Sequence, residues 1–302
     1  MDERRLAEFL GSKSGTAVDV RSVRRVALRP TRAIFDVDTT SGPFAVHVKL
    51  DGSTGPAPDT EFALMNSLAE TGFPIAAPRW SEPTGEVLGQ PFFVADGKAE
   101  PSVGDPSATT PAAYVQTLAR LHDLKPESHL PPVDADHAIA TQIELWRNVG
   151  KSAGGSRIPL LDAAELWLHK NVPLLKRASL VHGHPGARNI RTSNGQVVDV
   201  IDWEFAHVGS AAEDWSFLAT TGSSSNNPTE WRALIERETG TRLSADEWSY
   251  WEAFNLFKLA CGNRTYLAQF ETGADRSPAK MIAGTAVFHD VLRRLMNIVP
   301  VD

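Results

Sequence analysis

Within the first hundred residues, several short runs alternate apolar and polar positions, which is the pattern of strands that are buried on one face. Three such runs cover residues 23–28, 33–39 and 44–50, and short polar turns containing proline or glycine separate them. The runs predict an antiparallel meander of three strands. An amphipathic helix over residues 3–10 is expected to pack against this sheet.

A helix is predicted over residues 60–71, because apolar residues recur there at every third or fourth position. It follows the connector 51–58, which is rich in glycine, proline and serine. Asp59 stands just before this helix and is the predicted N-cap. Glu61 lies in its first turn, where a carboxylate complements the helix dipole.

The remaining chain is mostly helical in pattern. One predicted helix begins at Pro111, and others cover residues 139–149, 158–177 and 279–298. Ser244 and Glu247 form a predicted capping box at the start of a further long helix. Residues 100–110 turn to proline, serine, glycine and threonine, so we place a domain boundary there. The pattern thus predicts an α+β chain with a small sheet-containing part, residues 1–99, and a larger helical part, residues 100–302.

A hairpin with polar residues at its open end interrupts the helices. Asn194-Gly195 lies between the strand-like runs 189–193 and 196–203, and Asn-Gly is a strong signal for a tight hairpin turn. Pairing Ser193 with Gln196 would place Asn189 opposite Val200, with Asp202 two residues further. Their amide and carboxylate oxygens then suit Mg²⁺, although such residues are also common in turns and on surfaces.

Composition excludes several classes of function. The net charge is −7 and there is no Lys/Arg-rich run, so no nucleic-acid partner is expected. Cys261 is the single cysteine and excludes an internal disulfide framework. No signal-peptide core or membrane-length apolar run occurs, so we expect a cytoplasmic monomer or homodimer without a membrane partner.

The hairpin region resembles a known family. In the aminoglycoside phosphotransferase and choline kinase superfamily the segment reads His-Gly-Asp, four residues, Asn, and a hydrophobic strand ending in Ile-Asp-Trp. The matching residues here are His182, Gly183, Asn189, Ile201, Asp202 and Trp203. The resemblance implies a bilobal protein-kinase-like fold, ATP and Mg²⁺ as cofactors, and a small-molecule hydroxyl group as phosphate acceptor.

Three further runs narrow the resemblance. GQPFFVADG, YVQTLARLHDL and FNLFKLA look nearest to bacterial phosphotransferases related to the kinase-like domain that is fused to some acyl-CoA dehydrogenases. This relation implies that the acceptor is a hydroxylated acyl compound or another alcohol as readily as an antibiotic.

The resemblance also implies roles for single residues. Asn189 and Asp202 would hold Mg²⁺. Lys49, on the third strand, would reach the nucleotide phosphates, and Glu61 would pair with Lys49 and hold it in place. Asp214, near the start of a helix, would brace the catalytic loop.

Two departures from the family pattern leave the activity open. His184 stands where the family carries the catalytic Asp, and the first turn has Pro30, Thr31 and Arg32 in place of glycines, so a phosphate would be contacted through Arg32 or Thr31. Three hypotheses follow: a kinase with neutral His184 as base, a pseudokinase that binds without transfer, or different chemistry with His182 or His184 as acid or base.

Overall fold

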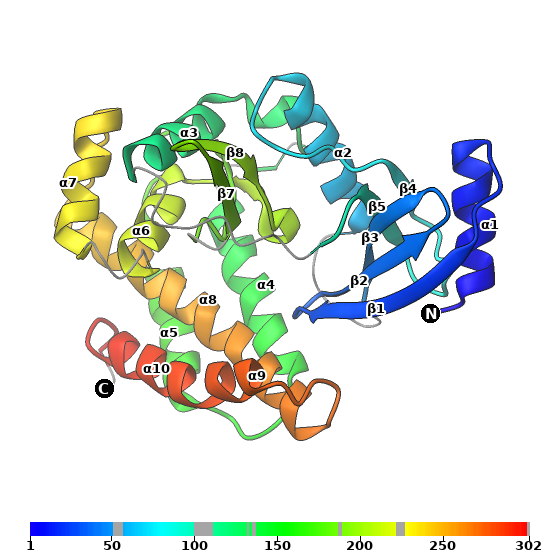
Figure 1. The fold of residues 1–302 in the computed structure, drawn as a ribbon. Coiled ribbons are helices and arrows are strands. Elements are labelled where there is room, and N and C mark those ends of the chain that lie inside the picture. The colour runs from blue at the N-terminus through cyan, green and yellow to red at the C-terminus, as the bar shows by residue number, and fades with distance from the viewer. Residues whose placement is uncertain are drawn as a thin grey trace.

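A computed structural model describes residues 1–50, 57–99, 111–131, 133–134, 137–186, 189–221 and 227–300. The described residues form a small lobe built on one sheet and a larger helical lobe (Figure 1). The predicted boundary at residues 100–110 and most of the predicted connector 51–58 lie outside the described residues. None of the described helices is both long and apolar enough to cross a lipid bilayer.

The small lobe contains a five-stranded antiparallel sheet with the strand order β1-β2-β3-β5-β4. Its strands are β1 (Val20–Leu28), β2 (Arg32–Thr39), β3 (Gly42–Lys49), β4 (Trp80–Glu82) and β5 (Phe92–Asp96). The predicted meander is therefore confirmed. In its register, Arg32 lies directly opposite Lys49, so both side chains share one face of the sheet.

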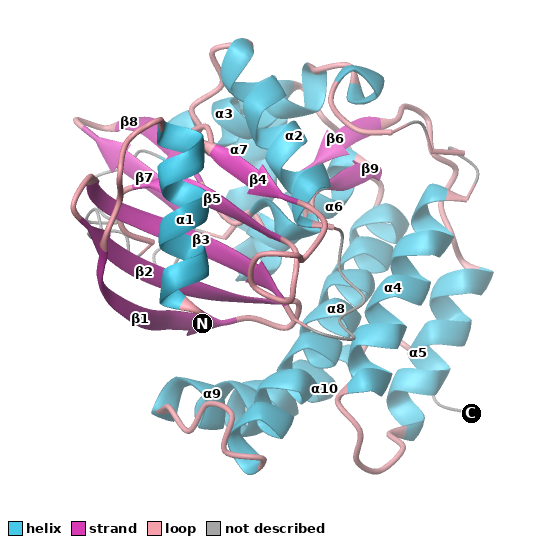
Figure 2. Ribbon diagram, turned by 90° about the vertical axis from the view of Figure 1, so that its right-hand side faces the viewer, coloured by secondary structure: helices cyan, strands magenta, loops and turns pink. Residues whose placement is uncertain are grey.

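Helix α1 (Glu3–Ser14) lies across the outer face of this sheet (Figure 2). Asp2 caps the helix by accepting a hydrogen bond from the Arg5 amide. Leu6 and Leu10 are fully buried in a cluster with apolar residues of β2, β3 and β5. This packing leaves the opposite face and the β1–β2 turn to meet the helical lobe.

Helix α2 (Pro58–Glu70) begins two residues earlier than predicted. Ala57 occupies the N-cap position without a side-chain cap, so the prediction of Asp59 as N-cap is wrong. Pro58 explains the difference, because its fixed φ and missing N–H favour the first helical position. Glu61 is buried one turn into the helix.

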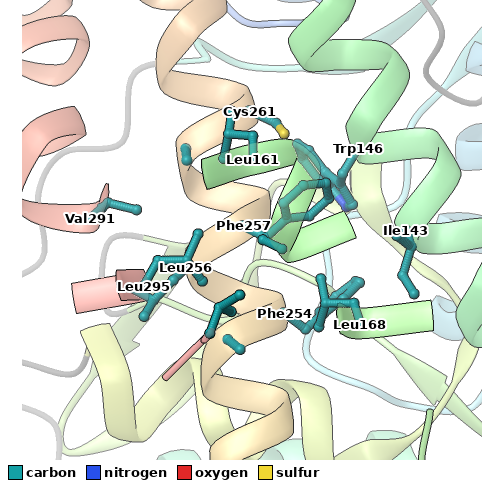
Figure 3. Close-up of a cluster of buried hydrophobic side chains, with 14 of the residues drawn as sticks. Ile143, Trp146, Leu161, Leu168, Phe254, Leu256, Phe257, Cys261, Val291 and Leu295 are labelled. Carbon is teal, nitrogen blue, oxygen red and sulfur yellow. The ribbon is translucent and has the colours of Figure 1, made fainter. Parts of the chain in front are cut away.

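The large lobe is built around the long helix α8. Its helices are α3 (Pro111–Asp123), α4 (Ala138–Ser152), α5 (Pro159–Lys170), α6 (Ala211–Thr221), α7 (Pro228–Thr239), α8 (Ala245–Glu271), α9 (Pro278–Ile282) and α10 (Phe288–Met296). The predicted capping box of Ser244 and Glu247 at the start of α8 is confirmed. Phe254, Phe257 and Cys261 project from α8 into a core shared with α4, α5 and α10 (Figure 3).

Two predicted helices differ in their extent. α5 ends at Lys170, seven residues before the predicted end at residue 177. The predicted helix 279–298 contains a π-helical segment, Ala283–Val287, between α9 and α10. A Cβ atom on Gly284 would lie 2.6 Å from Leu267 Cβ, so glycine permits the close contact of this segment with α8.

The hairpin consists of β7 (Ile190–Ser193) and β8 (Gln196–Val200), and β6 (Ser179–Val181) pairs with β9 (His207–Gly209) beside it. Ser193 pairs with Gln196 as predicted, and Asn194 has the positive φ of 52° that the turn requires. A bulge then shifts the register, so Val200 pairs with Ile190 and not with Asn189. The predicted register is wrong beyond the bulge.

Candidate active site

Asp202 lies at the centre of the site, just after β8. The strand ends two residues before it, and Asp202 has φ 74° and ψ 53°, a left-handed conformation that is uncommon outside glycine, asparagine and aspartate. A 3₁₀ turn, Trp203–Phe205, follows directly. This backbone reversal directs a carboxylate with 3% side-chain exposure into the junction between the lobes.

Both carboxylate oxygens of Asp202 have partners, and together these partners come from the two lobes. Oδ1 accepts from Arg32 Nη2 at 3.1 Å. Oδ2 accepts from His184 Nδ1 at 3.0 Å and from Asn189 Nδ2 at 3.3 Å, and it lies 3.7 Å from Arg29 Nη1. Burial alone would raise the pKa of Asp202, but the Arg29 guanidinium and the hydrogen bond from His184 hold that pKa well below its usual value.

His184 connects Asp202 with solvent. Its side chain is 31% exposed, and its ring packs edge-on against Phe217 with centroids 5.2 Å apart. Because Nδ1 donates to Asp202, Nε2 is the nitrogen that can accept a proton from a substrate. Asn189 Nδ2 also donates to the His184 carbonyl at 2.8 Å and so fixes the loop that carries this imidazole.

His182 is enclosed behind His184. Its Nε2 donates to the Ile201 carbonyl at 3.0 Å, and its Nδ1 accepts from the His184 amide at 3.1 Å. Burial lowers the pKa of His182 to about 4, which keeps the ring neutral. A neutral ring with both nitrogens engaged positions the loop and is poorly placed to exchange protons with a substrate.

Asp214 holds the same loop from α6. Its Oδ2 accepts from the His182 amide at 2.8 Å and its Oδ1 accepts from the Gly183 amide at 2.9 Å, so the predicted bracing role is confirmed. Buried His122 donates through Nε2 to Oδ2 at 2.9 Å. Gly183 has φ 79°, and a Cβ there would lie 2.5 Å from the Phe205 carbonyl oxygen, so only glycine fits.

Sequence reasoning missed a buried ion pair beneath the loop. Lys258 of α8 donates through Nζ to the Gly183 carbonyl at 2.6 Å and pairs with Glu213 Oε1 at 2.6 Å. Glu213 Oε2 lies 3.1 Å from His207 Nε2. The signal was a lysine in the middle of the apolar run FNLFKLA, since a lysine is rarely buried without a specific partner.

The small lobe contributes Arg32, which links three carboxylates. It forms a short contact with Glu61 through Nη1, donates to Asp202 through Nη2, and places Nε 3.4 Å from Glu204 Oε2. We predicted that Glu61 pairs with Lys49; within the described part of the chain, Glu61 instead forms its ion pair with Arg32. Arg32 begins β2 directly opposite Lys49, so it reaches Glu61 from the same end of the sheet.

Charge in this cluster is unbalanced, with three carboxylates around two arginines. Burial would lower the pKa of Arg32, but Glu61, Glu204 and Asp202 together raise it above its usual value. Burial raises the pKa of Glu61 to about 7 and also raises that of Glu204. Burial is thus the main reason why the pKa of Glu61 lies near neutrality, and the neighbouring Glu204 and Asp202 add to it.

Lys49 lies beside this cluster, in a hollow at the lobe junction. The hollow encloses about 250 Å³, open solvent included, and its lining residues are Thr31, Arg32, His47, Lys49, Pro58, Glu61, Phe93 and Glu204. The predicted phosphate-side residues Lys49, Glu61 and Arg32 are therefore brought together at the lobe junction.

The arrangement around Asn189 and Asp202 does not fit the magnesium ion that the resemblance implies. The two residues lie together as expected, but the Asn189 amide nitrogen faces Asp202, and two guanidinium groups contact its carboxylate. A divalent ion needs open oxygen ligands and would lie against like charges here. Among the described residues, no group of three or more His, Cys, Asp or Glu side chains has the geometry of a metal site.

The fold and this site define a protein-kinase-like phosphotransferase scaffold. The model of the phosphotransferase enzyme family matches residues 31–254, and the chain belongs to that family. Mouse acyl-CoA dehydrogenase family member 11 is 25% identical over 312 residues, an alignment that covers 92% of this chain and 40% of that protein. The chain thus spans less than half the length of this relative.

Solved structures share the fold. A protein from Ralstonia eutropha that is assigned as an aminoglycoside phosphotransferase aligns with a TM-score of 0.69 and 20% identity, over 99% of this chain and 98% of that chain. Spectinomycin phosphotransferase in complex with ADP and spectinomycin aligns with a TM-score of 0.58 and 13% identity, over 100% of this chain and 95% of that chain. The predicted α+β kinase-like fold is confirmed.

Proposed function

We propose that this protein transfers the terminal phosphoryl group of ATP to the hydroxyl group of a small molecule. The observation that carries the proposal is the meeting of His184, Asn189 and Asp202 with Arg32 and Lys49 at the lobe junction. Positioning and charge neutralisation supply most of the catalysis in phosphoryl transfer, and this junction offers both. The ADP bound to spectinomycin phosphotransferase supports a nucleotide as donor.

His184 acts as the general base in this proposal. The acceptor oxygen attacks the terminal phosphorus, the bond between that phosphorus and the bridging oxygen of ADP breaks, and the hydroxyl proton moves to His184 Nε2. Asp202 holds the Nδ1 proton and stabilises the imidazolium that forms, as a carboxylate does for a histidine base in hydrolases. Arg32 and Lys49 neutralise the nucleotide phosphates.

A binding module without transfer is the second candidate. The observation that favours it is the full engagement of the Asp202 carboxylate by Arg29, Arg32, His184 and Asn189. In this case the lobe junction binds a nucleotide, and the presence of His184 in place of the family's aspartate has ended transfer. Nucleotide binding is common to both candidates, so only the appearance of product separates them.

The acceptor belongs to one of two chemical classes. Spectinomycin phosphotransferase suggests an antibiotic hydroxyl, and the acyl-CoA dehydrogenase relatives suggest a hydroxylated acyl compound. The test is incubation of the protein with ATP and a panel of aminoglycosides, hydroxyacyl-CoAs and sugar alcohols, followed by mass spectrometry. We expect one class to gain a phosphoryl group. ATP binding without product would favour the binding module, and no ATP binding would overturn both candidates.

A further inference from the structure

Two arginines occupy the position beside Asp202 where a cation is expected. Arg32 Nη2 lies 3.1 Å from Oδ1, and Arg29 Nη1 lies 3.7 Å from Oδ2. Arg29 begins the β1–β2 turn and Arg32 is the first residue of β2, and the Arg29 amide closes the turn by donating to the Arg32 carbonyl at 2.7 Å. One short turn therefore supplies two positive charges to a single carboxylate.

The turn is attached to the helical lobe. Gln269 of α8 donates through Nε2 to the Arg29 carbonyl at 3.2 Å, and Lys280 of α9 donates through Nζ to the Leu28 carbonyl. The end of β1 accordingly points toward α8 and α9 (Figure 1). These bonds hold the arginines at the lobe junction from the backbone side, independently of their ion pairs.

Donor atoms remain available on both arginines. Among the described residues, Nε of Arg29 and Nε of Arg32 are buried without a hydrogen-bond partner, and so is Oε1 of Glu204. Arg32 itself is 5% exposed. Arg32 Nε faces Glu204 Oε2 at 3.4 Å without the geometry of a hydrogen bond, and Arg32 lines the same hollow as Lys49. Buried polar atoms without partners are uncommon in proteins, and the unsatisfied guanidinium donors at this junction indicate an anionic ligand.

We infer that Arg29 and Arg32 replace the divalent ion of this site, so that the polyphosphate chain of a nucleoside triphosphate binds at the lobe junction without a metal. The inference rests on the proposed function, since it assumes the same nucleotide. Guanidinium groups suit this task because their planar donors match phosphate oxygens and their charge does not titrate. Asp202, Glu61 and Glu204 orient the arginines through ion pairs.

The two departures from the family pattern fit together under this inference. The turn has Pro30, Thr31 and Arg32 in place of glycines, and His184 in place of aspartate removes one negative charge from the same site. A divalent ion placed at Asp202 would lie against Arg29 and Arg32 and be repelled. Added positive side chains and a lost carboxylate both reduce the affinity of the site for a metal.

Calorimetric titration of the full chain with ATP tests the inference, once in excess EDTA and once in excess Mg²⁺. We expect dissociation constants that agree within about threefold. Binding at least about tenfold tighter with Mg²⁺ would overturn the inference and leave the proposed function standing. No binding under either condition would overturn the proposed function itself.

A variant pair connects the result to the arginines. Arg29→Gln is suitable because the Arg29 side chain is 31% exposed, and exposed Arg21 on β1 gives the matched control Arg21→Gln. In EDTA, we expect Arg29→Gln to weaken ATP binding about tenfold or more and Arg21→Gln to leave it unchanged. Wild-type affinity of a folded Arg29→Gln protein, checked by circular dichroism, would contradict the inference.

Discussion

At the scale of single residues, the two lobes meet at the carboxylate of Asp202. Arg29 and Arg32 reach it from the sheet, and His184 and Asn189 reach it from the helical lobe. Its left-handed backbone costs about 1–2 kcal/mol relative to an extended one, and these contacts offset that cost. Loss of the Asp202 charge therefore affects both stability and chemistry.

Replacement of Asp202 by Asn should destabilise the protein by about 3 kcal/mol, because two buried guanidinium groups lose a counterion. It should also lower any phosphoryl transfer by about 100-fold, because His184 loses the partner that stabilises its charged form. Urea unfolding and steady-state assays measure the two effects. The control is Asp290→Asn in an exposed ion pair, where a change below about 1 kcal/mol is expected. Equal effects in both variants would contradict this role.

Replacement of His184 should separate chemistry from binding. His184→Gln keeps a polar side chain but cannot accept the proton, so turnover should fall by about 10²–10⁴-fold while ATP affinity is retained. His184→Asp should also lower turnover, because a second carboxylate would face Asp202. A higher turnover of His184→Asp would mean that His184 lowers the activity of this kinase relative to an aspartate. An unchanged turnover would show that His184 has no catalytic role.

At the scale of elements, helix α8 supports the catalytic loop through Lys258. The ammonium group is buried among Phe217, Phe254 and Trp146, with its nitrogen 5.2–5.9 Å from their ring centroids. It joins Glu213 of α6 to the Gly183 carbonyl. One side chain of the core helix thus fixes both α6 and the loop that carries His184.

Lys258→Met should destabilise the protein by about 3 kcal/mol, because Glu213 is left as a buried carboxylate with less compensation. The double variant Lys258→Met with Glu213→Gln should recover more than half of that loss, since it removes both charges. Urea unfolding of the two single variants and the double variant measures this coupling. Additive effects of the two substitutions would show that the pair does not act as a unit.

Strand β9 contributes a pH dependence through His207. Burial lowers the pKa of His207, but the nearby Glu213 carboxylate outweighs burial and raises the pKa above 6.5. The folded state then binds the proton more tightly, so this stabilisation is complete below about pH 6.5 and is lost as pH rises through the folded-state pKa. The free energy of unfolding of wild type minus that of His207→Gln should fall across this range. A difference that grows with pH would contradict the assignment.

Elements that depend on local sequence patterns could be predicted from the sequence. Alternation and helical spacing predicted the meander and α1, and the positions of Ser244 and Glu247 predicted the capping box of α8. The bulge in the hairpin and the reversal at Asp202 were not predictable, since tertiary contacts impose them. Asn189 and Asp202 were placed together by motif, but the ion pair of Arg32 with Glu61 depends on how two lobes meet.

At the scale of the whole molecule, the chain separates a sheet lobe from a helical lobe (Figure 1). A cluster of buried charges lies where the lobes meet. The single side chain of Arg32 contacts Glu61 of the small lobe and both Asp202 and Glu204 of the large lobe. The resemblance of one hairpin segment was enough to predict this architecture, because the motif belongs to one superfamily. The partners of each charge could be found only in three dimensions.

A crystal structure with a non-hydrolysable ATP analogue, grown in the presence of EDTA, would show whether the arginines bind the phosphates without a metal. We expect the nucleotide at the lobe junction, with phosphate oxygens within hydrogen-bonding distance of Arg29, Arg32 and Lys49 and the terminal phosphate facing His184. A nucleotide bound elsewhere, or phosphates that turn away from these side chains while Asp202 keeps both of its arginines, would contradict this expectation.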